Sequence, residues 1–470
     1  MTTSRQGAGS ATTDPAGPTG QLCQWLADFR LDQAPVTARE RAKTLILDGI
    51  ACAIVGAQLP WSRKAARIVQ QFEGRGNCTL IGWGTKTSAP GAALLNGTFI
   101  QGFELDDFHM LAPLHSASLV LPALFACAEG LDKVSGLQFL AAAQVGFEVG
   151  PRVGLALHGA QMLSRGWHSG SVFGTHAAAA AVGKLLGLDA ARFEDALGLA
   201  ATQSAGLMAA QYGFSARNGL YAAILADGGY TGIKRVFERE YGGFLSTFGE
   251  GHQPDASQIA SELGQRWEVE RIVIKPYAAM GGIHAPLDAL FDIGRQRKLV
   301  ASEIARIEVD VSHAVYHHGW WVPERPLTPI GAQMNIGYAL AVAVLDGAAM
   351  VQQFSPARID ADDVWALLAK VEVRHDPAFD TGGPLKRGQT RVAVTFADGQ
   401  RVVVERATSR AIESPPDTDA VAAKYRALTD GLMDRQRQQK IEHMVRSLEQ
   451  LDNIRELIAL LAPPVQAAFE

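Results

Sequence analysis

Cysteine is scarce in this 470-residue chain, which contains only four. All four lie in the first third of the sequence and none belongs to a Cys-x-x-Cys pair, so neither a disulfide framework nor a cysteine-based zinc site is expected. We expect reduced, mostly buried thiols in an intracellular, cytoplasmic protein. The four are Cys23, Cys52, Cys78 and Cys127.

Three other features are missing from the sequence. The formal net charge is −5 and there is no dense basic stripe, which argues against a nucleic-acid partner. No apolar run reaches membrane-spanning length without interruption; Leu45–Gly56 is short and contains Asp48, so no membrane span is expected. The chain has no Walker motif and no Gly-x-Gly-x-x-Gly after a strand, so no nucleotide cofactor is called for.

The chain is instead rich in small and apolar residues, with 47% apolar residues and 48 glycines beside alanine-rich runs. This composition favours close-packed helices. Residues 1–20, rich in Ser, Thr, Gly, Ala and Pro, are predicted to be a disordered tail, and residues 21–275 a helical domain. Within that domain we expect Thr37 to cap a helix in which Asp48 is a hydrogen-bonded core carboxylate.

The pattern changes after about residue 300. Residues 305–311 and 371–375 alternate as strands do, and residues 391–405 are predicted to form a hairpin around Asp398 and Gly399. Residues 276–418 are therefore predicted to form a smaller α+β domain. Residues 419–470 are helical again and are expected to return to the first domain. The predicted fold class is mainly α, with a large all-helical domain formed by the N- and C-terminal parts plus the α+β domain.

Carboxylates and imidazoles crowd the stretch before a long apolar run at residues 119–128. Pro113 disfavours helix at this point, and we expect Ser116 or Ser118 to cap the buried helix that follows. Acids and imidazoles beside a buried helix end can acquire the shifted pKa values that acid–base catalysis requires. The equally weighted alternative is a solvated acidic loop. The stretch contains Glu104, Asp106, Asp107, His109 and His115.

Two further histidines lie at similar loop-to-helix junctions. His168 is in a glycine-punctuated loop ahead of an alanine-rich helix, and His284 follows two glycines. Glycines let a ligand approach the backbone, and a helix N-terminus offers N–H donors to an anion. The alternative for His168 is a turn in which the ring only packs. We expect His115, His168 and His284 to converge on one cleft.

Longer stretches make the chain similar to a known family, the 2-methylcitrate dehydratase/aconitate decarboxylase family (MmgE/PrpD), and within it to the cis-aconitate decarboxylases. The resemblance covers about residues 45–461. It rests on Leu45–Ala53, Glu104–Asp107, Ala112–Ser118, Gly166–His168, Gly206–Gly213, Ala216–Leu220, Tyr241–Leu245 and Pro323–Pro326.

The resemblance implies a homodimer with a cofactor-free, metal-free active site between the two domains, acting on a small di- or tricarboxylate. It implies that His115, His168 and His284 are catalytic. It also implies substrate-binding roles for a second set of side chains, namely Glu104, Asp107, His109, Lys275 and Arg217.

The chain departs from this family at one point. Relatives carry a short basic segment, with a lysine attributed to the active site, between the residues matching Gly213 and Phe214; here the two are adjacent. Three explanations stay open. The chain has lost activity, or Arg217 or another cation substitutes for the lysine, or the gene model is wrong at this junction.

The chemistry follows from the expected substrate. A tricarboxylate carries about three negative charges at neutral pH, so the site needs cations and histidines that protonate near pH 7. Decarboxylation of cis-aconitate to itaconate requires protonation of an alkene carbon, whereas dehydration of a methylcitrate needs a base for a C–H proton and an acid for the hydroxyl. A catalytically impaired tricarboxylate-binding relative is the third alternative. Zinc ligation by the three histidines is disfavoured because they lack i, i+4 spacing.

Overall fold

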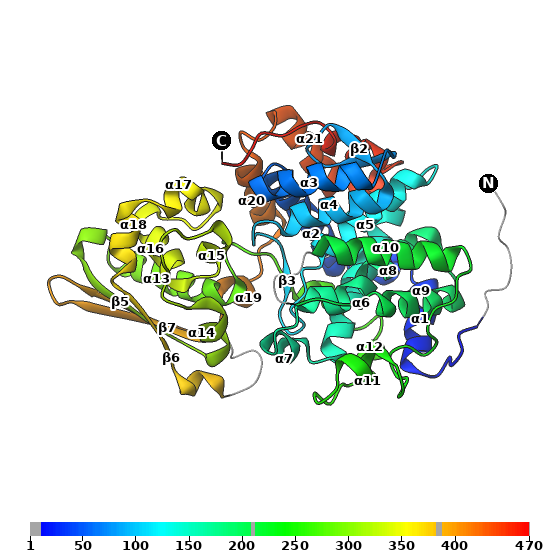
Figure 1. Ribbon diagram of the computed structural model, residues 1–470, viewed down its shortest axis with the longest axis horizontal. Coiled ribbons are helices and arrows are strands. Elements are labelled where there is room, and N and C mark those ends of the chain that lie inside the picture. Colours follow the sequence, from blue (N-terminus) through cyan, green and yellow to red (C-terminus); the bar gives the residue numbers. More distant parts are fainter. Residues whose placement is uncertain (1–10, 208–211, 382–387, 470) are drawn as a thin grey trace.

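The protein is described by a computed structural model that covers residues 11–207, 212–381 and 388–469. Figure 1 shows a larger body made of helices and a smaller body that carries a sheet. The chain builds most of the larger body, crosses to the smaller one, and returns with its last helices. The predicted fold class, mainly α with a smaller α+β part, is confirmed.

The larger body is a tightly packed set of helices. Small residues let the helices approach closely: a Cβ added to Gly213 of α10 would lie 2.0 Å from the Leu94 carbonyl oxygen of α4. Two short antiparallel strand pairs complete it: the hairpin of β1 (Cys78–Leu80) with β2 (Thr85–Thr87), and β3 (Phe108–His109) with the distant β4 (Ile272–Val273). The helices are α1 (Pro18–Asp28), α2 (Val36–Ala57), α3 (Pro60–Phe72), α4 (Ala89–Gln101), α5 (Ala117–Gly130), α6 (Gly136–Ala156), α7 (Gly159–Ser164), α8 (Ser169–Leu186), α9 (Ala190–Thr202), α10 (Tyr212–Asp227), α11 (Phe244–Phe248) and α12 (Ser257–Ala260).

The start of the chain differs from the expected tail of residues 1–20. Helix α1 already begins at Pro18, whose fixed φ suits a first helical turn. The Thr19 hydroxyl donates to Glu238 at 2.5 Å, and Thr13 donates to the buried Glu194. These contacts order the segment because they satisfy carboxylates of the larger body. Residues 1–10 lie outside the described residues.

The smaller body is built around a four-stranded sheet of order β6-β5-β7-β8. Only β5 and β6 run parallel; the other pairs are antiparallel. The predicted hairpin around Asp398 and Gly399 is confirmed, with Gly399 at φ 87° joining β7 to β8. The elements are α13 (His284–Gln296), β5 (Ile304–Val311), α14 (His313–Gly319), α15 (Pro329–Gln333), α16 (Ile336–Asp346), α17 (Pro356–Ile359), α18 (Asp362–Leu368), β6 (Val371–His375), β7 (Thr390–Phe396), β8 (Arg401–Arg406) and α19 (Arg410–Glu413).

The returning segment forms α20 (Thr418–Thr429), α21 (Arg435–Arg446) and α22 (Arg455–Leu461). Helix α20 packs on α2, so the two ends of the chain share one core. The expected core carboxylate Asp48 of α2 pairs with Lys424 of α20 at 2.6 Å. Thr37, expected to cap α2, instead lies inside it, because the helix begins at Val36 after Pro35.

The described residues contain no single helix that is long and apolar enough to cross a membrane; α2 and α3 meet the length and composition test only when joined, and they are bent by 85°. All four cysteines are free and buried, as expected from their scarcity.

Candidate active site

The segment between α4 and α5 is fixed at both ends. Glu104 follows α4 with a left-handed backbone, φ 52°, which is unusual for a non-glycine residue and turns the chain sharply. Phe108 and His109 then pair with Val273 and Ile272. The segment is therefore ordered, and the alternative of a solvated acidic loop is wrong.

Asp107 caps the helix that follows. Its carboxylate accepts hydrogen bonds from the backbone N–H groups of Ser116 at 2.7 Å and Ala117 at 2.9 Å. The expected cap, Ser116 or Ser118, is not used: Ser116 makes no capping bond, and the Ser118 hydroxyl donates to the His115 carbonyl. A carboxylate at a helix N-terminus also complements the helix dipole, which explains why it replaces a hydroxyl.

A chain of charged contacts leads from Lys275 to His115. Lys275 donates to Glu104 Oε2 at 2.8 Å and lies 3.8 Å from Asp106 Oδ1. The same Asp106 oxygen is 3.0 Å from His115 Nδ1. Lys275 and Asp106 are fully buried, whereas the His115 side chain keeps 15% of its surface exposed. Asp106 therefore binds Nδ1 of His115, while the exposed part of the ring stays accessible to a ligand.

His168 lies near His115, and the ring of Tyr212 packs against both imidazoles. The two imidazole centroids are 6.5 Å apart, and the Tyr212 ring lies 5.0 Å from His115 and 4.7 Å from His168. His168 is the residue before α8, and the Tyr212 hydroxyl accepts from Gly170 N–H in the first turn of that helix. The Nδ1 atom of His168 is buried without a hydrogen-bond partner among the described residues, so a substrate group could satisfy it.

His284 begins α13 and comes from the smaller body. Its Nε2 is 2.9 Å from the Ala279 carbonyl oxygen, and its buried Nδ1 has no hydrogen-bond partner in the described part of the chain. Its ring packs edge-on against Phe108 and Tyr277. The charges of Lys275 and Glu104, which act on His115, act on His284 as well.

The electrostatics divide the three histidines. Burial opposes protonation of His115, but the Asp106 carboxylate outweighs it and raises the pKa of His115 above its usual value. Burial, with His115 nearby, lowers the pKa of His168 to about 4, and burial and Lys275 lower the pKa of His284 to about 3. The site therefore favours the imidazolium form of His115 and keeps His168 and His284 neutral near neutral pH.

The two carboxylates beside the histidines also differ. Burial favours the neutral form of Glu104, but Lys275 and His115 outweigh it and lower its pKa to about 2. Burial and the adjacent Asp106 raise the pKa of Asp107. Burial opposes protonation of Lys275, yet Glu104 and Asp106 raise its pKa, so this ammonium stays charged.

Two of the expected substrate-binding residues have other contacts. His109 is fully buried, with Nδ1 accepting from Ala112 N–H and Nε2 facing Glu268 at 3.1 Å. The Arg217 guanidinium stacks on Phe214 at 5.1 Å and donates to Asn218. Among the described residues these are contacts within the fold, as is the cap that Asp107 forms for α5. Lys275, by contrast, binds Glu104 directly and is linked to His115 through Asp106.

Sequence reasoning did not single out Asp106 or Tyr212 as site residues. Asp106 stood in the acidic segment, but only the fold shows that it, and not Asp107, orients His115. Tyr212 lay within the stretch Gly206–Gly213 that carries the family resemblance, which was the available signal. The part of that stretch at residues 208–211 lies outside the described residues.

The site combines a fixed ammonium, one imidazolium and two neutral imidazoles, an arrangement suited to binding an anion and transferring a proton to it. Among the described residues, no group of three or more His, Cys, Asp or Glu side chains is placed to hold a metal ion. The fold and the site together define a two-domain, mainly helical protein with a histidine–carboxylate–lysine acid–base site.

Comparison with known proteins gives the family. The MmgE/PrpD N-terminal domain matches residues 20–257 and the MmgE/PrpD C-terminal domain matches residues 277–450. The chain belongs to the MmgE/PrpD family.

Curated relatives match over nearly the whole length. The chain is 44% identical to the cis-aconitate decarboxylase-like protein oryM of Aspergillus oryzae, over 96% of this chain and 98% of that one. It is 42% identical to the cis-aconitate decarboxylase of Aspergillus terreus, over 96% and 97%. It is 26% identical to the human cis-aconitate decarboxylase, over 90% of each.

Proposed function

We propose that the protein is a carboxy-lyase that decarboxylates cis-aconitate, or a close alkyl analogue, to itaconate. The observation that carries the proposal is the contact of His115 with Asp106 beside the Lys275–Glu104 pair, because it provides a proton donor next to a fixed cation. The names of the relatives at 42–44% identity favour decarboxylation over the dehydration of an alkylcitrate.

The reaction is a protonation coupled to loss of carbon dioxide. The bond between the allylic methylene carbon and its carboxylate breaks, and its electron pair forms the new terminal double bond. The electrons of the original double bond take a proton at the far alkene carbon, which gives itaconate. His115, as the imidazolium, is the donor on the substrate side, and general-acid help of this kind is typically worth about 10²–10⁴-fold.

The retained carboxylates need fixed partners during this step. Lys275 offers a charge that is already oriented by Glu104, and the neutral imidazoles of His168 and His284 offer uncommitted Nδ1 atoms. Preorganised groups of this kind stabilise developing charge without reorganising at the moment of reaction. His115 regains its proton from solvent through its exposed edge.

The test is to incubate the purified protein separately with cis-aconitate and with 2-methylcitrate and to identify the products by NMR. Itaconate and carbon dioxide from the first substrate, with no conversion of the second, are expected. Dehydration of 2-methylcitrate alone would establish the alternative reaction. Binding of cis-aconitate without turnover would identify a catalytically impaired relative.

We also propose a cytoplasmic homodimer. Helix α10 leaves apolar side chains exposed at positions spaced as one helix face, which a second copy can cover. They are Phe214, Tyr221, Ile224 and Leu225. Sedimentation should give twice the monomer mass for the native chain and the monomer mass for Ile224→Lys; a native monomer would refute the dimer. The four free, buried cysteines support a reducing compartment.

A further inference from the structure

Lys424 contacts the backbone of the active-site segment from the far end of the chain. Its Nζ donates to the Leu105 carbonyl oxygen at 2.9 Å, and the same ammonium lies 2.6 Å from Asp48 Oδ1. The three residues belong to three separate segments: the returning helix α20, the loop after α4, and α2. One ammonium therefore ties the acidic segment to both ends of the chain.

The Asp48–Lys424 pair is buried, so its charges carry a desolvation cost. The Asp48 side chain is 2% exposed and the Lys424 side chain 11% exposed. Burying a carboxylate and an ammonium costs several kcal/mol of desolvation, which their attraction offsets only with good geometry. A hydrophobic pair would fill this space at no such cost, so the charges serve something other than packing alone.

Leu105 stands between two residues that act on His115. Glu104, with its left-handed backbone, binds Lys275, and Asp106 holds His115 Nδ1. The direction of the Leu105 carbonyl fixes the plane of the peptide bond that joins Leu105 to Asp106. A donor on that oxygen thus controls where the Asp106 carboxylate points.

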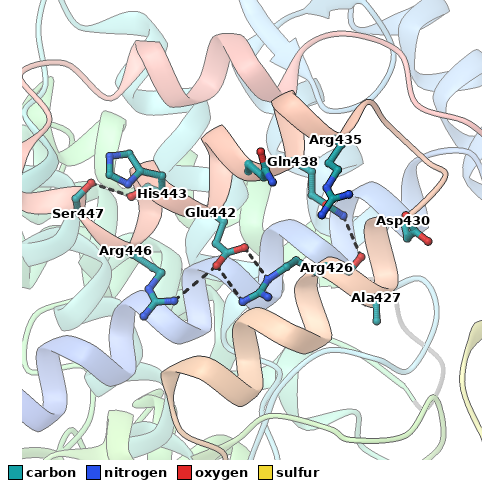
Figure 2. Close-up of a pocket in the computed structure, with 10 residues that line it drawn as sticks. Arg426, Ala427, Asp430, Arg435, Gln438, Glu442, His443, Arg446 and Ser447 are labelled. Carbon is teal, nitrogen blue, oxygen red and sulfur yellow. Dashed lines mark hydrogen bonds and ion pairs between the residues drawn. The ribbon is translucent and has the colours of Figure 1, made fainter.

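Helix α20 is itself held firmly from its other side. Figure 2 shows Arg426 of α20 paired with Glu442 of α21, at 2.9 Å, where the two helices line a cavity of about 920 Å³. Gln438 of α21 donates to the Arg426 carbonyl oxygen at 2.9 Å. Lys424, two residues earlier on the same helix, faces the opposite way and contacts α2 and the loop.

We propose that Lys424, with Asp48 as its counter-ion, is a positioning residue that directs the Asp106 carboxylate at His115 through the Leu105 carbonyl. The effect on kcat/KM rests on the proposed decarboxylation. The effect on the pKa of His115 does not, because that pKa can be measured in the protein without substrate. The charged and titratable groups that act on His115 include Asp106, Lys275, Glu104, Asp107 and His168. Of these groups, Asp106 alone both follows Leu105 in the chain and hydrogen-bonds to the His115 ring.

The experiment compares two variants that share one substitution. Asp48→Asn keeps the Lys424 bond to Leu105, whereas Asp48→Asn with Lys424→Met removes it and leaves no unpaired buried charge. The Met side chain suits the site because the Lys424 stem borders a largely apolar cavity of about 400 Å³. Arg426→Met is the matched control, since it removes an ion pair from the solvent side of the same helix.

Two readouts separate this role from a merely structural one. The pKa of His115, followed by NMR and assigned with His115→Gln, should fall by at least about half a unit in the double variant and stay in place in Asp48→Asn and Arg426→Met. The kcat/KM for cis-aconitate should fall about ten- to a hundredfold in the double variant alone, as small misplacements of catalytic groups do.

The outcomes are distinct. A folded double variant with an unshifted His115 pKa would overturn the positioning role, whatever its activity. If the native protein does not turn over cis-aconitate, the proposed function fails, but the NMR comparison still decides the role of Lys424. If the double variant does not fold, Lys424→Gln takes its place. The shorter glutamine side chain moves the donor away from the Leu105 carbonyl while filling most of the volume of the lysine. An unshifted His115 pKa in that variant would equally refute the proposal.

Discussion

Replacing Asp106 with asparagine should convert His115 from an imidazolium into a neutral imidazole at neutral pH. The carboxylate lies 3.0 Å from His115 Nδ1 and is the strongest influence that raises its pKa. Without it, burial and Lys275 both act to lower the pKa, and the more weakly acting carboxylates, Glu104 among them, oppose them. The pKa of His115 should then fall below its usual value of about 6.5.

The magnitude follows from the protonated fraction. A pKa of about 6.5 leaves roughly one imidazole in ten protonated at pH 7.5, and each further unit removes another factor of ten, about 1.4 kcal/mol. In the proposed mechanism activity requires the His115 imidazolium. Activity is therefore full below the pKa of His115 and is lost as the pH rises through that pKa. A raised pKa extends activity to higher pH, and Asp106→Asn should move this alkaline limit to lower pH.

The assay is kcat/KM for itaconate formation measured from about pH 5.5 to about pH 8.5, the range in which histidines titrate. Asp106→Asn should lose about ten- to a hundredfold at pH 7.5 and regain part of it in acid. Asp107→Asn is the matched control: it weakens the cap of α5, at a cost of about 0.5–2 kcal/mol in unfolding free energy, with a smaller effect on the pH limit. An alkaline limit that does not move in Asp106→Asn would refute the assignment of His115 as the proton donor.

Four further results are expected. Lys275→Met should raise the KM for cis-aconitate about ten- to a hundredfold, because a hydrogen bond to a charged group is worth about 1.5–3 kcal/mol; an unchanged KM would exclude Lys275 from substrate binding. Tyr212→Phe should lower kcat no more than about tenfold, since the ring stays and the change removes the hydroxyl that accepts from Gly170 N–H. Dialysis against EDTA should leave activity intact, and a strict metal requirement would contradict the mechanism. Inserting the relatives' basic segment between Gly213 and Phe214 should raise turnover if the missing lysine binds substrate; equal turnover in the two forms would show that the segment is dispensable.

The sequence predicted those parts of the site that local pattern encodes. His168 precedes α8 and His284 opens α13, as their loop-to-helix settings indicated, and the Asp398–Gly399 turn forms its hairpin. These features depend on residues close in sequence, where glycine, capping and alternation are informative. The roles assigned to the three histidines stay predictions that the kinetics above will test.

The remaining parts depend on contacts between distant segments. Three acids within four residues look equivalent in the sequence, yet the left-handed turn at Glu104 sends Asp106 to His115 and Asp107 to the start of α5. Lys424 comes to the loop from 319 residues away. No local periodicity specifies such pairings, since a charge buried in the finished core requires a partner, and that partner comes from a distant segment.

The return of the chain to its first body has a consequence for biosynthesis. All three histidines have left the ribosome long before Lys424, which follows Leu105 by 319 residues. Domains generally fold as they emerge, but this larger body lacks α20 to α22 until translation is nearly complete. A premature stop after the smaller body would therefore leave His115, His168 and His284 in place and yet yield a protein without a finished site. Nascent chains of this enzyme should acquire activity only in the last stage of synthesis.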